Sequence, residues 1–158
     1  MNCNEILEII RPLLINYNDD YDLPTDADWD MHENYFNTEF SDTYKELIRL
    51  ISKYEETEIL NISSGKTNGG YRVLTAYKIE TELGNWPEIM IPIYYNGIGD
   101  YDCLNSNEGK ISKVYTVYHE DRSVEVVADS IEEWIVELPK SLSDERIIRD
   151  SSDDDFSI

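Results

Sequence analysis

Basic residues are scarce in this chain, which has 13 Lys and Arg against 34 Asp and Glu among its 158 residues. The formal net charge of -21 argues against nucleic-acid and anionic-membrane binding, because proteins that bind phosphate groups use Lys and Arg to displace counterions. No motif indicates a small-molecule ligand. We therefore expect a basic protein as the partner and no direct contact with nucleic acid or membrane.

Cysteine is almost absent, and Cys3 and Cys103 do not form a recognisable disulfide framework or zinc site. The chain also lacks an apolar run near the ~20 residues that a membrane helix needs. Its first residues include Glu5 and Glu8, where a signal peptide carries basic residues. We expect reduced thiols and a cytoplasmic protein.

A complete phosphate-binding loop and a catalytic triad are both lacking. Gly65–Thr67 resembles the end of a phosphate-binding loop, but Leu60 replaces the required earlier glycine. His32 and His119 have no Ser or Cys in a recognisable nucleophile setting. The sequence predicts no catalytic residue and no cofactor, so an enzyme is the least supported of the functional hypotheses.

The segment from Asp26 to Asn37 resembles an EF-hand calcium-binding loop but lacks two of its required residues. Asp26, Asp28 and Asp30 have the spacing of its first ligands, whereas Met31 and Asn37 replace the glycine and the bidentate glutamate. The sequence therefore predicts no metal site.

Acidic residues are instead concentrated in one segment, since every charged side chain between Asp19 and Asp42 is acidic. Over 21–40 these acids alternate with aromatic residues, and we expect an ordered acidic loop with a short helix. The predicted partner-contact residues of this segment are Asp19, Asp20, Asp22, Asp26, Asp28 and Asp30. An evenly solvated surface without a partner is the alternative interpretation.

The remaining pattern predicts an α+β fold in a single domain over 1–140, with helices around an antiparallel sheet of about six strands. The expected strands are Glu58–Ile62, Tyr71–Glu80, Ile89–Tyr95, Tyr101–Leu104, Val114–Tyr118 and Val124–Ala128. The expected helices are Ile6–Tyr17 with a kink at Pro12, a helix that Asp42 caps and that runs to Tyr54, and Ser130–Leu138, which Pro139 ends. Residues 141–158 are expected to form an acidic, mobile tail.

The most informative stretch is Pro87–Asn105, in which an alternating strand leads into Asn96-Gly97-Ile98-Gly99 and then into a second strand. The two glycines permit the positive φ angles of a tight reversal, so a hairpin is predicted. Asp100, Tyr101 and Asp102 follow the turn and form the second predicted partner-contact patch. Asp100 and Asp102 also have the spacing of a general acid/base pair, but a solvated or partner-facing edge is the commoner outcome.

At these residues the sequence resembles the SUKH superfamily, which contains bacterial toxin-immunity proteins and the yeast cell-wall-assembly regulators. The resemblance rests on the stretch Ile91–Asn105, on the strand around Val114-Tyr115 and on the helix-forming Asp129–Ile135. It implies an immunity protein that neutralises a toxin domain, often a nuclease, by stoichiometric occlusion. A cytosolic interaction scaffold or regulator without inhibitory activity is the alternative.

Overall fold

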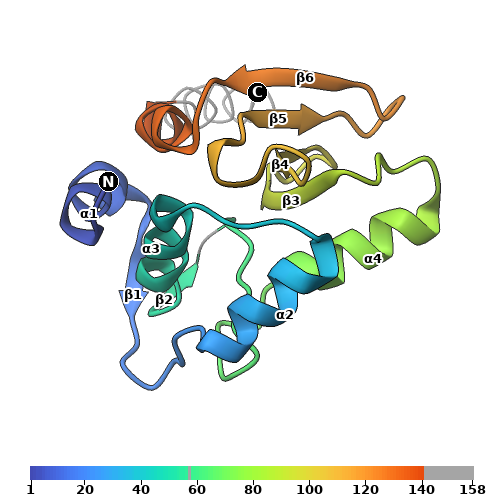
Figure 1. The fold of residues 1–158 in the computed structure, drawn as a ribbon. Helices are drawn as coiled ribbons and strands as arrows, with labels where there is room; N and C mark the ends of the chain where they lie inside the picture. The colour runs from blue at the N-terminus through green and yellow to red at the C-terminus, as the bar shows by residue number, and fades with distance from the viewer. Residues whose placement is uncertain (57, 141–158) are drawn as a thin grey trace, which may run out of the picture.

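The computed structural model describes residues 1–56 and 58–140, and the expected tail over 141–158 lies outside the described residues. Figure 1 shows a main sheet at one end of the molecule and helices below and beside it. This sheet is antiparallel with strand order β3-β4-β5-β6. Its strands are β3 (Met90–Tyr95), β4 (Tyr101–Asn105), β5 (Val114–Val117) and β6 (Val124–Ala128).

The α+β class predicted from the sequence is confirmed, but the main sheet has four strands and not six. A separate two-stranded sheet pairs β1 (Ile15–Tyr17) with β2 (Tyr54–Glu56). The β1 strand lies where the sequence predicted the end of a helix. That helix is shorter, because α1 (Cys3–Ile10) ends before Pro12, which lies in the 3-10 turn η1 (Arg11–Leu13).

The predicted hairpin between β3 and β4 is confirmed. Gly97 and Gly99 have φ angles of 88° and 104°, and Asn96 Oδ1 accepts hydrogen bonds from the backbone N–H groups of Ile98 and Asp100. A Cβ at Gly99 would lie 3.0 Å from the side chain of His119. Both backbone angle and space therefore require glycine at this position.

The predicted strand Tyr71–Glu80 is wrong, because α4 (Val73–Leu83) is a helix. Its β-branched residues favour a strand locally, but Val73 and Ala76 are buried at helical spacing. Contact with β3 and with α2 through the rings of Phe36 and Tyr77, whose centroids are 5.0 Å apart, overrides the local preference.

The predicted strand Glu58–Ile62 is only partly formed. Leu60 N–H donates to Ile93 O over 2.8 Å, and Tyr95 N–H donates to Glu58 O over 3.1 Å. Ile59 and Tyr94 form an isolated antiparallel bridge. This segment therefore covers part of the free edge of β3 without extending the sheet by a full strand.

Two further helices follow β1 in sequence, α2 (Asp26–Phe36) and α3 (Asp42–Ile51). Thr25 caps α2 in a reciprocal capping box with Asp28, and Asn37 ends it in the left-handed conformation. The short helix predicted for the acidic segment is thus confirmed as α2, which has 11 residues. Ser41 and not Asp42 caps α3.

Residues 131–140 are helical and lie over the main sheet (Figure 1). Ser130 Oγ accepts a hydrogen bond from Glu133 N–H, as the capping-box spacing predicts. The described helical residues run to Lys140, one residue beyond Pro139, where the sequence predicted the helix to end.

One hydrophobic core joins the elements. Trp29 of α2 contacts Phe40 and Tyr44 with ring centroids 5.8 and 5.9 Å apart, and Trp134 contacts Tyr94 at 5.8 Å. Such aromatic pairs stabilise the packing beyond the area they bury. Within the described part of the chain, every helix is too short or too polar to cross a lipid bilayer.

Candidate partner-binding surface

An open groove follows α2. It consists of two adjoining hollows of about 800 and 750 Å³ that share Asp30 and Glu33. The first lies between α2, α3 and the start of α1, and the second lies between the end of α2 and the loop 106–111. We call these two hollows the acidic groove.

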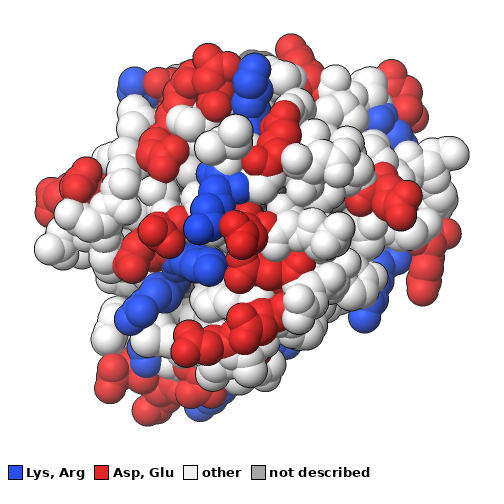
Figure 2. All heavy atoms as spheres, viewed as in Figure 1, with Lys and Arg blue, Asp and Glu red and all other residues white. Residues whose placement is uncertain are grey.

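Seven acidic and three basic residues line the acidic groove. The basic ones are Lys45, Arg49 and Lys110, and the acidic ones are Asp26, Asp30, Glu33, Glu39, Asp42, Glu46 and Glu108. Figure 2 shows acidic side chains spread over α2 and α3 with basic side chains among them. The groove is therefore negative overall, but its charge is not of one sign.

Helical spacing brings these acids together. Asp26, Asp30 and Glu33 are separated by four and three residues on α2, which places them on one side of that helix. On α3, Asp42 and Glu46 are four residues apart, and they face the same hollow. Two helices that pack on a common core thus present one row of carboxylates each.

Ion pairs neutralise part of this charge. Lys45 Nζ lies 3.4 Å from Glu33 Oε1 and 5.6 Å from the centroid of the Trp29 ring, and Lys110 Nζ lies 3.9 Å from Glu39 Oε2. Asp30 and Glu46 have no ion pair among the described residues. These acids and the exposed Asp26 are available to a partner.

Asp28 differs from its neighbours because its residue is only 4% exposed. Its carboxylate accepts hydrogen bonds from the backbone N–H groups of Thr25 and Ser64 over 3.0 and 3.3 Å. Burial raises the pKa of Asp28, but these hydrogen bonds outweigh burial and lower it below its usual value. Asp28 therefore fixes the start of α2 and does not line the groove.

The other predicted acids of the segment lie before α2 and outside the groove. Asp19, Asp20 and Asp22 are exposed, and Asp22 Oδ2 accepts a hydrogen bond from Lys66 N–H over 2.8 Å. A Cβ at Gly65 would lie 2.4 Å from Asp22 Oδ2. The Gly65–Thr67 segment is thus packed against a carboxylate.

The second predicted patch is mostly enclosed. Tyr101 is 4% exposed, with its ring packed on Trp86 and Tyr95. Asp100 is buried and accepts hydrogen bonds from the N–H and the Nδ1 of His119 over 2.8 and 2.7 Å. Asp102 lies on β4 and is half-buried, and both aspartates line a cleft beside the helix 131–140. The structure thus brings Asp100 and Asp102 to one cleft but separates them from the acidic groove.

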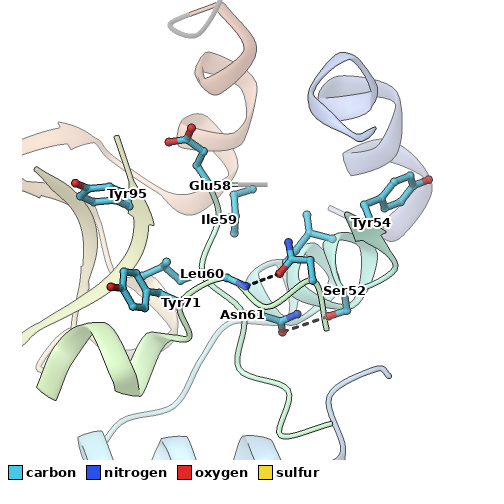
Figure 3. Close-up of a pocket in the computed structure, with 11 residues that line it drawn as sticks. Ser52, Tyr54, Glu58, Ile59, Leu60, Asn61, Tyr71 and Tyr95 are labelled. Atoms are coloured by element: carbon cyan, nitrogen blue, oxygen red, sulfur yellow. Dashed lines mark hydrogen bonds between the residues drawn. The ribbon is translucent and has the colours of Figure 1, made fainter. Parts of the chain in front are cut away.

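A smaller cavity of about 180 Å³ lies near the end of β3 and is shown in Figure 3. Tyr71 and Tyr95 lie on one side of it, and Ser52 and Asn61 lie on the other (Figure 3). Asn61 Oδ1 accepts hydrogen bonds from the N–H groups of Ile62 and Ser63 over 2.7 and 3.0 Å. Asn61 therefore holds the chain segment that follows β2.

His32 does not have the setting of a catalytic base. His32 is buried, its Nδ1 lies 2.7 Å from Asp28 O, and burial lowers the pKa of its ring. His119 is held by Asp100 in the turn after β5. Across 1–56 and 58–140, no cluster of three or more His, Cys, Asp or Glu side chains has the geometry of a metal site.

Sequence reasoning missed the contribution of five acids to the groove, namely Glu33, Glu39, Asp42, Glu46 and Glu108. The four-residue spacing of Asp42 and Glu46 in the helix predicted from the sequence was a usable signal. The sequence contains no comparable signal for Glu108, because its position depends on how the loop after β4 packs near the end of α2.

Two of three comparisons with known proteins found a match. The model of the SUKH_5 family, described as SMI1-KNR4 cell-wall, matches residues 3–140. The structure is similar to a crystal structure of a protein from Pseudomonas syringae pv. tomato, with a TM-score of 0.55 and 16% identity over 83% of this chain and 93% of that chain. That likeness concerns the fold alone, and no curated protein matches. The family match extends over the helices and the sheet described above, and the chain therefore belongs to the SUKH_5 family of the SUKH superfamily.

Proposed function

We propose that the chain is an immunity protein that binds a basic bacterial toxin domain through the acidic groove and neutralises it by stoichiometric occlusion. The observation that carries this proposal is the excess of acidic over basic residues along an open groove between α2, α3 and the loop 106–111. Membership of the SUKH superfamily supports it, because that superfamily includes bacterial immunity proteins.

The physical argument begins with the partner. A toxin that cleaves nucleic acid needs a basic surface to hold phosphate groups. A negative groove attracts that surface at long range, raises the rate of association and competes with the substrate for the same contacts. Such an inhibitor needs no catalytic group of its own.

The test is affinity capture from a bacterial lysate with the tagged protein and with a groove variant that combines Asp26→Asn, Asp30→Asn and Glu46→Gln. These three acids have no ion pair among the described residues, so their neutral forms leave the fold intact. A control variant with Glu82→Gln, Glu88→Gln and Glu120→Gln removes the same charge from exposed positions outside the groove.

We expect the wild type and the control to retain one basic protein that elutes with salt, and the groove variant to lose it. The toxic activity of that protein should fall in proportion to the wild-type protein added, reaching zero near one equivalent. A captured partner that keeps its full activity would replace immunity with the scaffold function. Equal capture by the groove variant would refute the role of the groove.

A further inference from the structure

A second acidic site lies between the main sheet and the helix 131–140. It is a cleft of about 300 Å³, which we call the Trp134 cleft. The residues that matter here are Tyr94, Asp100, Asp102, Thr116, Trp134 and Glu137. No Lys or Arg among the described residues lines it, so the cleft combines aromatic walls with carboxylates and lacks a positive charge.

The carboxylate of Asp102 has only neutral partners. Its Oδ1 accepts a hydrogen bond from Thr116 Oγ1 over 2.7 Å, and its Oδ2 accepts one from Trp134 Nε1 over 2.8 Å. None of the ion pairs in the described part of the chain includes Asp102. A buried carboxylate is normally paired with a cation, and among the described residues no cation lies beside Asp102.

Burial raises the pKa of Asp102, and the hydrogen bonds from Thr116 and Trp134 offset only part of that effect. Repulsion from the charge of Asp100 raises the pKa of Asp102 further. The protein thus keeps a carboxylate in a place where its ionised form is disfavoured. A fold that needed only a hydrogen-bond acceptor for Trp134 would be served as well by a neutral amide.

Asp100 adds a fixed negative charge to the same cleft. Burial acts to raise its pKa, but the hydrogen bonds from His119 and Asn96 lower it overall, so Asp100 is ionised at neutral pH. Asn96 Nδ2 donates to Asp100 Oδ2 over 3.2 Å. Glu137 lies at the rim, where Lys140 Nζ is 3.4 Å from its carboxylate.

The chemistry of the cleft fits a planar cation. The rings of Tyr94 and Trp134 have centroids 5.8 Å apart at an angle of 72°, and both line the cleft. A guanidinium group stacks on aromatic faces and donates two parallel hydrogen bonds to a carboxylate. Each carboxylate oxygen of Asp102 accepts more than one hydrogen bond, so Thr116 and Trp134 leave acceptor capacity.

We propose that the Trp134 cleft binds the guanidinium group of an arginine side chain that a basic protein partner inserts. The assignment of the arginine to a partner rests on the proposed function, whereas the chemistry of the cleft does not. The chain's own Arg146 and Arg149 lie outside the described residues and are the competing source.

The experiment follows the indole N–H resonance of Trp134 by NMR while N-acetyl-arginine amide is added at constant ionic strength. N-acetyl-citrulline amide is the matched probe, because it has the same shape without the charge. We expect a saturable shift with the arginine probe and no saturable shift with the citrulline probe. Equal shifts with both probes, or none with either, would overturn the proposal.

Variants separate binding from folding. Asp102→Asn keeps an acceptor for Trp134 and should weaken binding of the arginine probe at least about tenfold, equivalent to about 1.4 kcal/mol. Glu137→Gln, a surface change at the rim, should weaken it about two- to threefold. Glu120→Gln, which lies in the turn between β5 and β6, should leave it unchanged. Unchanged binding in Asp102→Asn would overturn the proposal.

Two further variants identify the source of the arginine and keep this proposal distinct from the groove. Replacing Arg146 and Arg149 by Gln should leave the probe affinity unchanged, and a tighter affinity would assign the cleft to the chain's own arginine and not to a partner. The groove variant should bind the arginine probe as the wild type does. Loss of capture by the groove variant with an intact probe shift would therefore show that the two sites are independent.

Discussion

The acidic groove and the Trp134 cleft both present carboxylates, but two acids of the groove are exposed to water, whereas the two aspartates of the cleft are buried or half-buried. Asp26 and Asp30 are exposed, whereas Asp100 is buried and Asp102 has its two hydrogen bonds inside the protein. Exposed charges act at long range and are screened by salt. Charges that the protein encloses act at contact distance and alter stability and pKa. The two regions should therefore respond differently to the same loss of charge.

The largest difference is expected between a buried and an exposed ion pair. Arg122 Nη2 lies 2.6 Å from Glu80 Oε2, with side chains 15% and 12% exposed, and the guanidinium also lies 5.5 Å from the Trp86 ring. Glu80→Gln leaves that guanidinium without its counter-ion and should lower the free energy of unfolding by about 2–4 kcal/mol. Urea unfolding of the wild type and the variant measures this loss of free energy.

Asp129→Asn is the matched control, because the Asp129 carboxylate lies 4.0 Å from Lys113 Nζ at the surface. It should change the free energy of unfolding by less than about 0.5 kcal/mol. Equal losses in the two variants would show that burial does not decide the contribution of an acid here.

A smaller difference is expected between two acids of α2 that are two residues apart. Asp28→Ala removes the acceptor of the Thr25 and Ser64 N–H groups and should lower the free energy of unfolding by about 1–3 kcal/mol. Asp30→Ala, at an exposed position of the same helix, should change it by less than about 0.5 kcal/mol. Similar values from urea unfolding would contradict the structural role of Asp28.

The pH dependence of stability distinguishes Asp102 from Asp100. The pKa of Asp102 is raised in the folded state, so its protonation stabilises the fold fully below 3.8, the ordinary value of an aspartate. That contribution is lost as the pH rises through the raised pKa. The advantage of Asp102→Asn over the wild type in unfolding free energy should therefore increase from pH 3.8 to neutral pH and then stay constant.

The stability contribution of Asp100 should depend on pH in the opposite direction, because the pKa of Asp100 is lowered in the folded state. Its contribution is present above pH 3.8 and is lost as the pH falls through the lowered value. The difference in unfolding free energy between the wild type and Asp100→Asn should shrink on acidification. A parallel pH profile for the two variants would contradict the contrast between them.

The smallest effect is expected for a buried group without charge. The hydroxyl of Tyr44 is fully buried and has no hydrogen-bond partner among the described residues. Tyr44→Phe should therefore raise the free energy of unfolding by about 0.5–1.5 kcal/mol, because no hydrogen bond is lost and the burial of a polar group is avoided. A loss of more than 1 kcal/mol in urea unfolding would reveal an interaction of the hydroxyl.

The sheet was predictable where its determinants are local. The β3–β4 hairpin follows from Asn96, Gly97 and Gly99, whose turn geometry depends on few neighbours. The α4 helix was mistaken for a strand because Val73, Thr75 and Ile79 favour strands locally, while packing against α2 and β3 decides the outcome.

For the candidate sites, the sequence predicted the types of residue involved but not how the fold brings these residues together. The density of acids between Asp19 and Asp42 indicated a charged surface, and helical spacing places Asp26 and Asp30 on one face. The burial of Asp28 depends on Ser64, which is far away in sequence. The Trp134 cleft depends in the same way on contact between β4 and the helix 131–140, which no local pattern specifies.

The most direct test of the central claim is the rate of association between this protein and the captured partner, measured by stopped-flow fluorescence at several ionic strengths. The rate for the wild type should fall steeply with salt, and the groove variant should be slower at low salt with a shallower dependence. The control variant, with the same charge removed elsewhere, should follow the wild type more closely. Identical salt dependence for the groove variant and the control would contradict binding through the acidic groove.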